Sequence, residues 1–106
     1  MPPYPELDRA IAAVVTLADL AGVLRTLRRR HGRQHPGGPL TYRELAAKLG
    51  YSHGIIGEYL TGNVLAPVDR FDALVGLLGA TPAERGLLAT ARDDVEDRRR
   101  ARPVAA

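Results

Sequence analysis

The chain of 106 residues is long enough for one domain with one modest core, because a chain of this length buries roughly two-thirds of its unfolded surface. Its composition, 45% hydrophobic and 25% charged, is that of a globular protein and excludes a disordered one. The absence of cysteine excludes disulfides, a thiolate zinc site and a cysteine nucleophile. No apolar run approaches the ~18 residues of a membrane span and no signal-peptide pattern is present, so we expect a cytoplasmic protein without a membrane partner.

Basic residues are concentrated in two short blocks, although the net charge is only +3. The first block comprises Arg25, Arg28, Arg29, Arg30 and Arg33. The second lies in residues 98–102, and the stretch 69–97 between the blocks is acidic. Because a compact basic block can neutralise phosphates, we assign the first block to electrostatic contacts with phosphate groups. The alternative is a solvated helix end, where arginine is favoured by the helix dipole.

Helix-capping patterns recur along the chain and separate apolar stripes with helical spacing. The pattern of a threonine followed three residues later by an acid begins at Thr16, Thr41 and Thr81. In chain order we expect helices from Pro5 to Val15, Thr16 to Gly32, Thr41 to Gly50, Ser52 to Gly62, Pro67 to Gly79, and from Pro82 into the charged tail. We divide the chain into an N-terminal helical extension (1–16), a domain (17–92), and a charged helix end and tail (93–106). The sequence thus predicts an all-α protein, a compact bundle of five or six short helices.

The segment 41–62 combines two of these helices with a tight turn. It reads TYRELAAKLGYSHGIIGEYLTG, and Gly50 allows the positive φ that a sharp reversal needs. We expect the two helices to approach most closely at Ala46, where only a small side chain fits. The buried seam beneath the crossing is predicted to contain Leu45, Leu49, Ile56 and Tyr59. This arrangement is a helix-turn-helix, whose second helix can enter a major groove.

With these residues, the sequence resembles the lambda-repressor-like (XRE) family of helix-turn-helix domains over about residues 17–90. The motif is particularly similar to small actinobacterial members, and the continuation Ala66-Pro67 is typical of the family. The resemblance implies a bacterial, sequence-specific DNA-binding regulator of transcription, cytoplasmic and nucleoid-associated when bound to DNA.

The resemblance also implies, position by position, which residues contact DNA. They are Thr41, Tyr42, Arg43, Ser52, His53, Gly54, Gly57, Glu58 and Asn63. The residues from Ser52 to Gly54 begin the recognition helix, and Gly57 and Glu58 follow on its exposed face. Thr41 and Tyr42 stand at a helix N-terminus that faces a phosphate in relatives, and Asn63 begins another phosphate-contacting loop.

Two departures from the family pattern leave a second function open. Gly54 and Gly57 place no side chain at positions that usually read base edges. Glu58 can accept a hydrogen bond from a cytosine amino group, but its charge repels phosphate. Either the glycines let the helix lie close to the bases, or the helix does not read DNA. In the second case the chain is a helical protein-interaction module, an adaptor or the N-terminal domain of a larger assembly.

The expected partners are double-stranded DNA, a second copy of the chain and, under the alternative, another protein. The apolar stripes that we expect to join two copies are Ile11/Val14/Val15 and Leu87/Leu88/Ala91/Val95. His31 and His35 have a metal-ligand spacing but no third ligand nearby, so we expect no metal. We also expect no cofactor, no catalytic residues and hence no enzyme.

Overall fold

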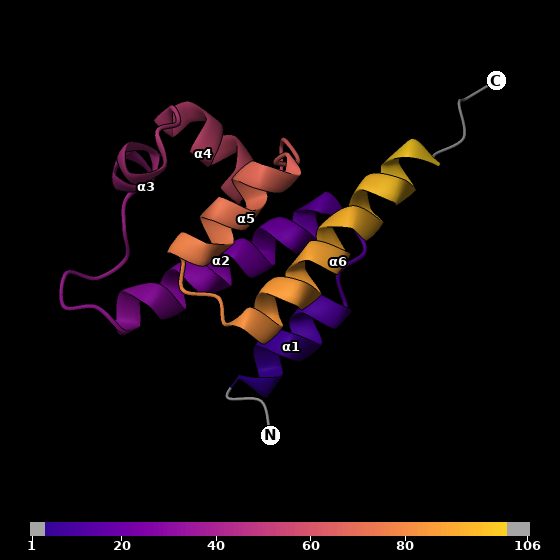
Figure 1. Cartoon of the computed structure of the whole chain (residues 1–106), viewed down its shortest axis with the longest axis horizontal. Coiled ribbons are helices and arrows are strands. Elements are labelled where there is room, and N and C mark those ends of the chain that lie inside the picture. Colours follow the sequence, from indigo (N-terminus) through magenta and orange to yellow (C-terminus); the bar gives the residue numbers. More distant parts are fainter. Residues whose placement is uncertain (1–3, 102–106) are drawn as a thin grey trace.

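The computed structural model describes residues 4–101 of the chain, and this part contains six helices and no strand (Figure 1). The helices are α1 (Pro5–Ala12), α2 (Leu17–Arg33), α3 (Tyr42–Leu49), α4 (His53–Thr61), α5 (Val68–Leu77) and α6 (Pro82–Arg100). The all-α bundle predicted from the sequence is confirmed. None of the helices in the described part is long and apolar enough to cross a membrane.

The helix starts follow local capping chemistry. At Thr16, Thr41 and Thr81 the hydroxyl accepts from the backbone N–H three residues on, and the acid at that position accepts from the threonine N–H in return. Each such box satisfies two amides that the helix itself leaves free. The Ser52 hydroxyl caps α4 by accepting from the Ile55 N–H at 3.2 Å. All four N-caps lie where the sequence predicts them.

Two predicted helix ends are wrong by a few residues, whereas Gly79 (φ 82°) follows the C-cap Leu78 and closes α5 as the sequence predicts. The first helix stops at Ala12 instead of Val15. Helix α2 continues through Gly32 to Arg33. A methyl group at Gly32 would lie only 2.6 Å from the Pro39 nitrogen, so this glycine admits the returning loop and does not end the helix. The expected boundary between residues 92 and 93 falls inside α6.

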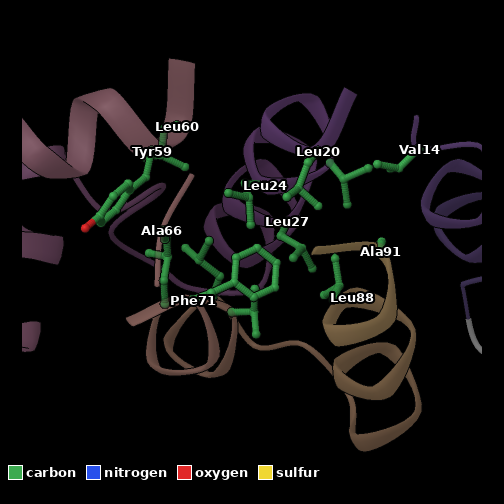
Figure 2. Packing of buried hydrophobic residues seen from close by; sticks show 14 of the residues in the cluster. Val14, Leu20, Leu24, Leu27, Tyr59, Leu60, Ala66, Phe71, Leu88 and Ala91 are labelled. Carbon is green, nitrogen blue, oxygen red and sulfur yellow. The ribbon is translucent and has the colours of Figure 1, made fainter. Parts of the chain in front are cut away.

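The core forms where helices from both halves of the chain meet. Figure 2 shows leucines of α2, Leu60 of α4, Leu88 of α6 and the ring of Phe71 of α5 in one cluster. Phe71 is 1% exposed, and Leu60 and Leu88 are fully buried. Burial of large apolar side chains is the main favourable term in folding, so this cluster holds α4 and α6 onto α2, and α5 onto α6.

The two apolar stripes proposed as dimer surfaces instead pack against each other within one chain. Helix α1 lies alongside α6 (Figure 1). Ile11 and Val14 on one side, and Leu88, Ala91 and Val95 on the other, are all buried. Of the two stripes, only Val15 and Leu87 keep exposed side chains. The expectation that these stripes join two copies is therefore wrong, because each stripe already has the other as its apolar partner.

A buried ion pair joins α2 to the start of α6. The Arg30 guanidinium donates to both carboxylate oxygens of Glu84, at 2.7 and 2.8 Å, and to the Gly79 carbonyl at 3.1 Å. Both side chains are almost fully buried, and the Arg30 guanidinium also lies 4.0 Å from the centre of the Tyr4 ring. Burial by itself raises the pKa of Glu84, but hydrogen bonds from Arg30 and Thr81 outweigh it and hold the pKa below its usual value.

Replacement of Glu84 by glutamine should destabilise the protein strongly. Glu84→Gln leaves the Arg30 charge buried without a counter-ion, and breaking a buried pair in this way costs about 3–5 kcal/mol. The free energy of unfolding in urea measures the effect. Arg100→Gln is the matched control, because it breaks an exposed pair with Glu96 (2.8 Å) that should contribute less than about 1 kcal/mol. Equal losses in the two variants would contradict the structural role of Arg30 and Glu84.

The same pair predicts a pH dependence of stability. Because the pKa of Glu84 is lower in the folded protein than its usual 4.5, its stabilisation is complete above that value and is lost as the pH falls through the lower, folded pKa. Between about pH 5 and pH 3, the free energy of unfolding should therefore fall more steeply for the wild type than for Glu84→Gln. The other two capping acids, Asp19 and Glu44, are unchanged in the variant. Parallel pH profiles would show that Glu84 does not titrate in this way.

Candidate nucleic-acid interface

Helices α3 and α4 form a helix-turn-helix. Gly50 adopts a left-handed conformation (φ 75°), and its N–H donates to the Ala46 carbonyl at 2.8 Å, which ends α3. The Tyr51 N–H donates to the same carbonyl at 3.0 Å, and α4 begins two residues later. Ala46 is buried and α3 packs against α4, as the sequence predicts for the crossing. Both helices lie at the end of the molecule away from α1 (Figure 1).

The outward face of α4 carries few polar side chains. His53 and Gly54 are exposed, whereas Gly57 and Glu58 are half-buried. A methyl group at Gly54 would meet no atom within 4 Å, so no packing demand within the described chain explains this glycine. The Ser52 hydroxyl is engaged in the cap, and the Thr61 hydroxyl donates to the Gly57 carbonyl at 2.7 Å. His53 and Glu58 are the side chains on this face that remain free to contact a base.

The N-terminus of α3 is partly occupied by internal contacts. The Thr41 hydroxyl and the Glu44 carboxylate bond to each other's backbone N–H groups, at 3.1 and 3.0 Å. The Tyr42 ring is half-buried, 5.3 Å from the Arg28 guanidinium, and a methyl group at Gly57 would lie 3.7 Å from it. Tyr42 therefore packs α3 between α2 and α4. Of the remaining predicted residues, Arg43 and Asn63 are exposed.

The five arginines of residues 25–33 do not form one exposed block. Arg25 donates to the Leu60 carbonyl near the end of α4 at 2.7 Å, and Arg28 donates to the Leu40 carbonyl before α3 at 2.8 Å. Arg30 is buried against Glu84. Of the five phosphate contacts expected from the sequence, the one assigned to Arg30 is therefore wrong, because this side chain is buried in an ion pair. Arg25 and Arg28 each bond to the chain's own backbone, and their contacts with phosphate stay predictions. Charge counted along the sequence could not show which of these guanidinium groups bond to other segments of the chain.

Arg29 and Arg33, like Arg25, are exposed members of that block. Together with Gly32 and Pro39 they line a surface hollow of about 290 Å³ between α2 and the returning loop. Arg29 also donates to the Thr26 hydroxyl at 3.0 Å. This hollow offers two positive charges on a concave surface, which suits a phosphate group.

One cluster near the turn was not anticipated from the sequence. The Arg70 guanidinium lies 4.3 Å from the centre of the Tyr51 ring and donates to the Tyr59 hydroxyl at 3.3 Å. The three residues belong to α5, to the turn before α4 and to α4. Because they are well separated along the chain, no local pattern in the sequence marks them as a cluster.

Metal binding has no support in the described part of the chain, where no three His, Cys, Asp or Glu residues are placed to hold an ion. The His31 and His35 rings stack with centroids 3.8 Å apart, and no third ligand joins them there. Burial lowers the pKa of His31, which favours its neutral form beside His35 and Lys48.

Comparison with known proteins adds one finding. A family model described as a helix-turn-helix domain matches residues 19–88, which extend from the first turn of α2 into α6. No curated protein and no solved structure matches the chain. The match therefore covers the α3–turn–α4 unit and the helices that support it.

Enlarging the side chain at the helix crossing should destabilise the fold. Ala46→Leu forces extra methyl and methylene groups between α3 and α4, and such overpacking costs about 1–3 kcal/mol. The neighbouring Ala47 is exposed, so Ala47→Leu is a matched control with an expected change within about 0.5 kcal/mol. Thermal denaturation of both variants provides the measurement. A melting temperature for Ala46→Leu equal to that of the control would remove Ala46 from the crossing.

Proposed function

The chain belongs to the helix-turn-helix domain family, and on this premise we propose that it binds double-stranded DNA with α4 in the major groove. The observation that carries the proposal is the placement of α4. Its inner side is fixed by the fully buried Ile56 and Leu60, while its capped N-terminus and outer face are open. A helix supported from one side and open on the other is the geometry that groove recognition requires.

Affinity in this proposal comes from contacts with the phosphate backbone. Arg29 and Arg33 line a positive hollow, and Arg43 and Lys48 add exposed cations on α3. Asn63, with Thr41 at the start of α3, would complete the contacts that the lambda-repressor-like resemblance implies. Such contacts release counterions and make binding strongly dependent on salt.

Sequence readout in this proposal depends on few side chains. Glu58 accepts a hydrogen bond from a cytosine amino group, and His53 at the first position of α4 reaches a second base edge. Gly54 and Gly57 add no side chain between the α4 backbone and the bases, which permits a close approach. The function is then that of a sequence-specific transcriptional regulator of the XRE type, acting on the nucleoid in the cytoplasm of a bacterium, most similar to actinobacterial members.

One observation favours a second candidate, a helical protein-interaction module. The outer face of α4 carries Glu58 as its one charged group within the described chain, and two glycines replace larger side chains. A surface with a single carboxylate is poorly suited to a polyanion and better suited to another protein. A second copy of the chain is one such partner, although it must use surfaces other than the α1 and α6 stripes.

Two variants separate phosphate binding from base reading. Arg29→Gln/Arg33→Gln should weaken binding to all duplexes alike and lower the salt slope by about 0.9 for each lost phosphate contact. Glu58→Ala should keep or raise non-specific affinity, while discrimination at one base pair falls by about 1–3 kcal/mol. Fluorescence anisotropy on a labelled duplex of mixed sequence measures the first effect. Selection from a random DNA library measures the second.

The control for charge is Arg9→Gln/Arg85→Gln, which removes two exposed positive charges from α1 and α6. This control should change the salt slope less than the α2 variant. If the wild-type chain shows no salt-dependent DNA binding, the protein-interaction function replaces the DNA-binding one. A consensus sequence that is unchanged in Glu58→Ala would show that α4 does not read DNA through Glu58.

A further inference from the structure

The cluster of Arg70, Tyr51 and Tyr59 holds a cation beside the helix-turn-helix. The Arg70 guanidinium lies over the Tyr51 ring at 4.3 Å, within the range of a cation–π interaction. It also donates to the Tyr59 hydroxyl at 3.3 Å. Two contacts from two different segments therefore restrain one long side chain that starts in the first turns of α5.

The Arg70 guanidinium forms no ion pair within the described chain. The Tyr59 hydrogen bond makes the largest contribution that raises the pKa of Arg70, and the neighbouring Asp69 is close enough to raise it further. The ion pairs found between residues 4 and 101 involve Arg30, Arg92 and Arg100, and no carboxylate lies within 4.0 Å of the Arg70 guanidinium. A guanidinium has five N–H donors, and one intramolecular hydrogen bond is found for Arg70. Arg92 is different, because its guanidinium reaches the Ala66 carbonyl and two carboxylates. Arg70 is thus a restrained, half-buried cation with most of its donors free.

The position of this cation is next to the N-terminal end of α4. Tyr51 directly precedes Ser52, the residue that caps α4, so the ring that Arg70 covers belongs to the turn itself. If α4 enters a major groove, the phosphate groups that border the groove pass close to the two ends of that helix. A planar guanidinium there can bind a phosphate through two parallel hydrogen bonds.

We infer that Arg70 binds a backbone phosphate of the DNA, and that Tyr51 and Tyr59 are positioning residues that hold its guanidinium for this contact. The inference rests on the proposed DNA-binding function and adds a specific contact to it. A flexible arginine loses rotamer freedom on binding, and the ring and the hydroxyl impose part of that restriction beforehand. A purely structural Arg70 would tie α5 to the turn without affecting DNA.

The experiment compares Arg70→Gln with Arg85→Gln, which removes the same charge from the exposed surface of α6. Binding of the full chain to a labelled duplex of mixed sequence is followed by anisotropy from low to high salt. Arg70→Gln should lower the affinity about tenfold at low salt. It should also reduce the salt slope by about 0.9, the value for one phosphate. Arg85→Gln should have a clearly smaller effect on both.

Two further variants test the positioning role. Arg70→Lys keeps the charge but loses the planar fork, so the affinity should fall while the salt slope is preserved. Tyr51→Leu leaves Arg70 in place but removes the ring that restrains it, and it should weaken binding with an unchanged slope. Circular dichroism confirms that each variant is folded at the temperature of the binding assay. If Arg70→Gln fails to fold, the lysine and leucine variants decide the question.

The outcomes separate this inference from the function on which it rests. Wild-type protein without salt-dependent DNA binding would overturn both. Wild-type binding, together with an Arg70→Gln slope and affinity equal to those of Arg85→Gln, would overturn the Arg70 contact and leave DNA binding intact. Unchanged affinity in both Arg70→Lys and Tyr51→Leu would likewise exclude a positioned phosphate contact.

Discussion

The buried pair of Arg30 and Glu84 is the constraint on which the arrangement of the helices depends. One carboxylate caps the first turn of α6 through the Thr81 N–H and also neutralises a guanidinium from α2. Because an unpaired charge in the interior is very costly, α6 must begin at this place on α2. Helix α6 then covers α1 along its apolar stripe, and the α5–α6 turn is held by the Arg30 contact with Gly79.

Helix α2 also positions the helix-turn-helix, through arginine hydrogen bonds to backbone carbonyl groups. Arg25 reaches the end of α4, and Arg28 reaches the backbone just before α3. Both guanidinium groups donate to carbonyl oxygens that would otherwise lack a partner at a helix end or in a loop. The chain therefore uses arginines that are close together in sequence to fix three segments.

This use of charge shapes the candidate site. The α4 face has one carboxylate, an imidazole and two glycines, while exposed cations lie on α2 and α3 and the half-buried Arg70 lies beside the turn. Phosphate contacts and base contacts would then be made by different helices, so substitutions should affect affinity and specificity separately. A helix with so little side-chain chemistry can discriminate among sequences only through a very close approach or a few well-placed hydrogen bonds.

The six helices, four side-chain N-caps and the helix-turn-helix could be predicted from the sequence, because these features depend on residues within a few positions of one another. The capping threonines, the turn at Gly50 and the small Ala46 are all of this kind. Three features could not be predicted: the burial of Arg30, the packing of the α1 and α6 stripes on each other, and the contacts of Arg70 with Tyr51 and Tyr59. Gly32 is the clearest example. Glycine commonly ends a helix, but α2 continues through Gly32, and its lack of a side chain makes room for Pro39. Such contacts join residues that are far apart in the chain. Local patterns of charge and hydropathy therefore cannot predict which residues will be in contact.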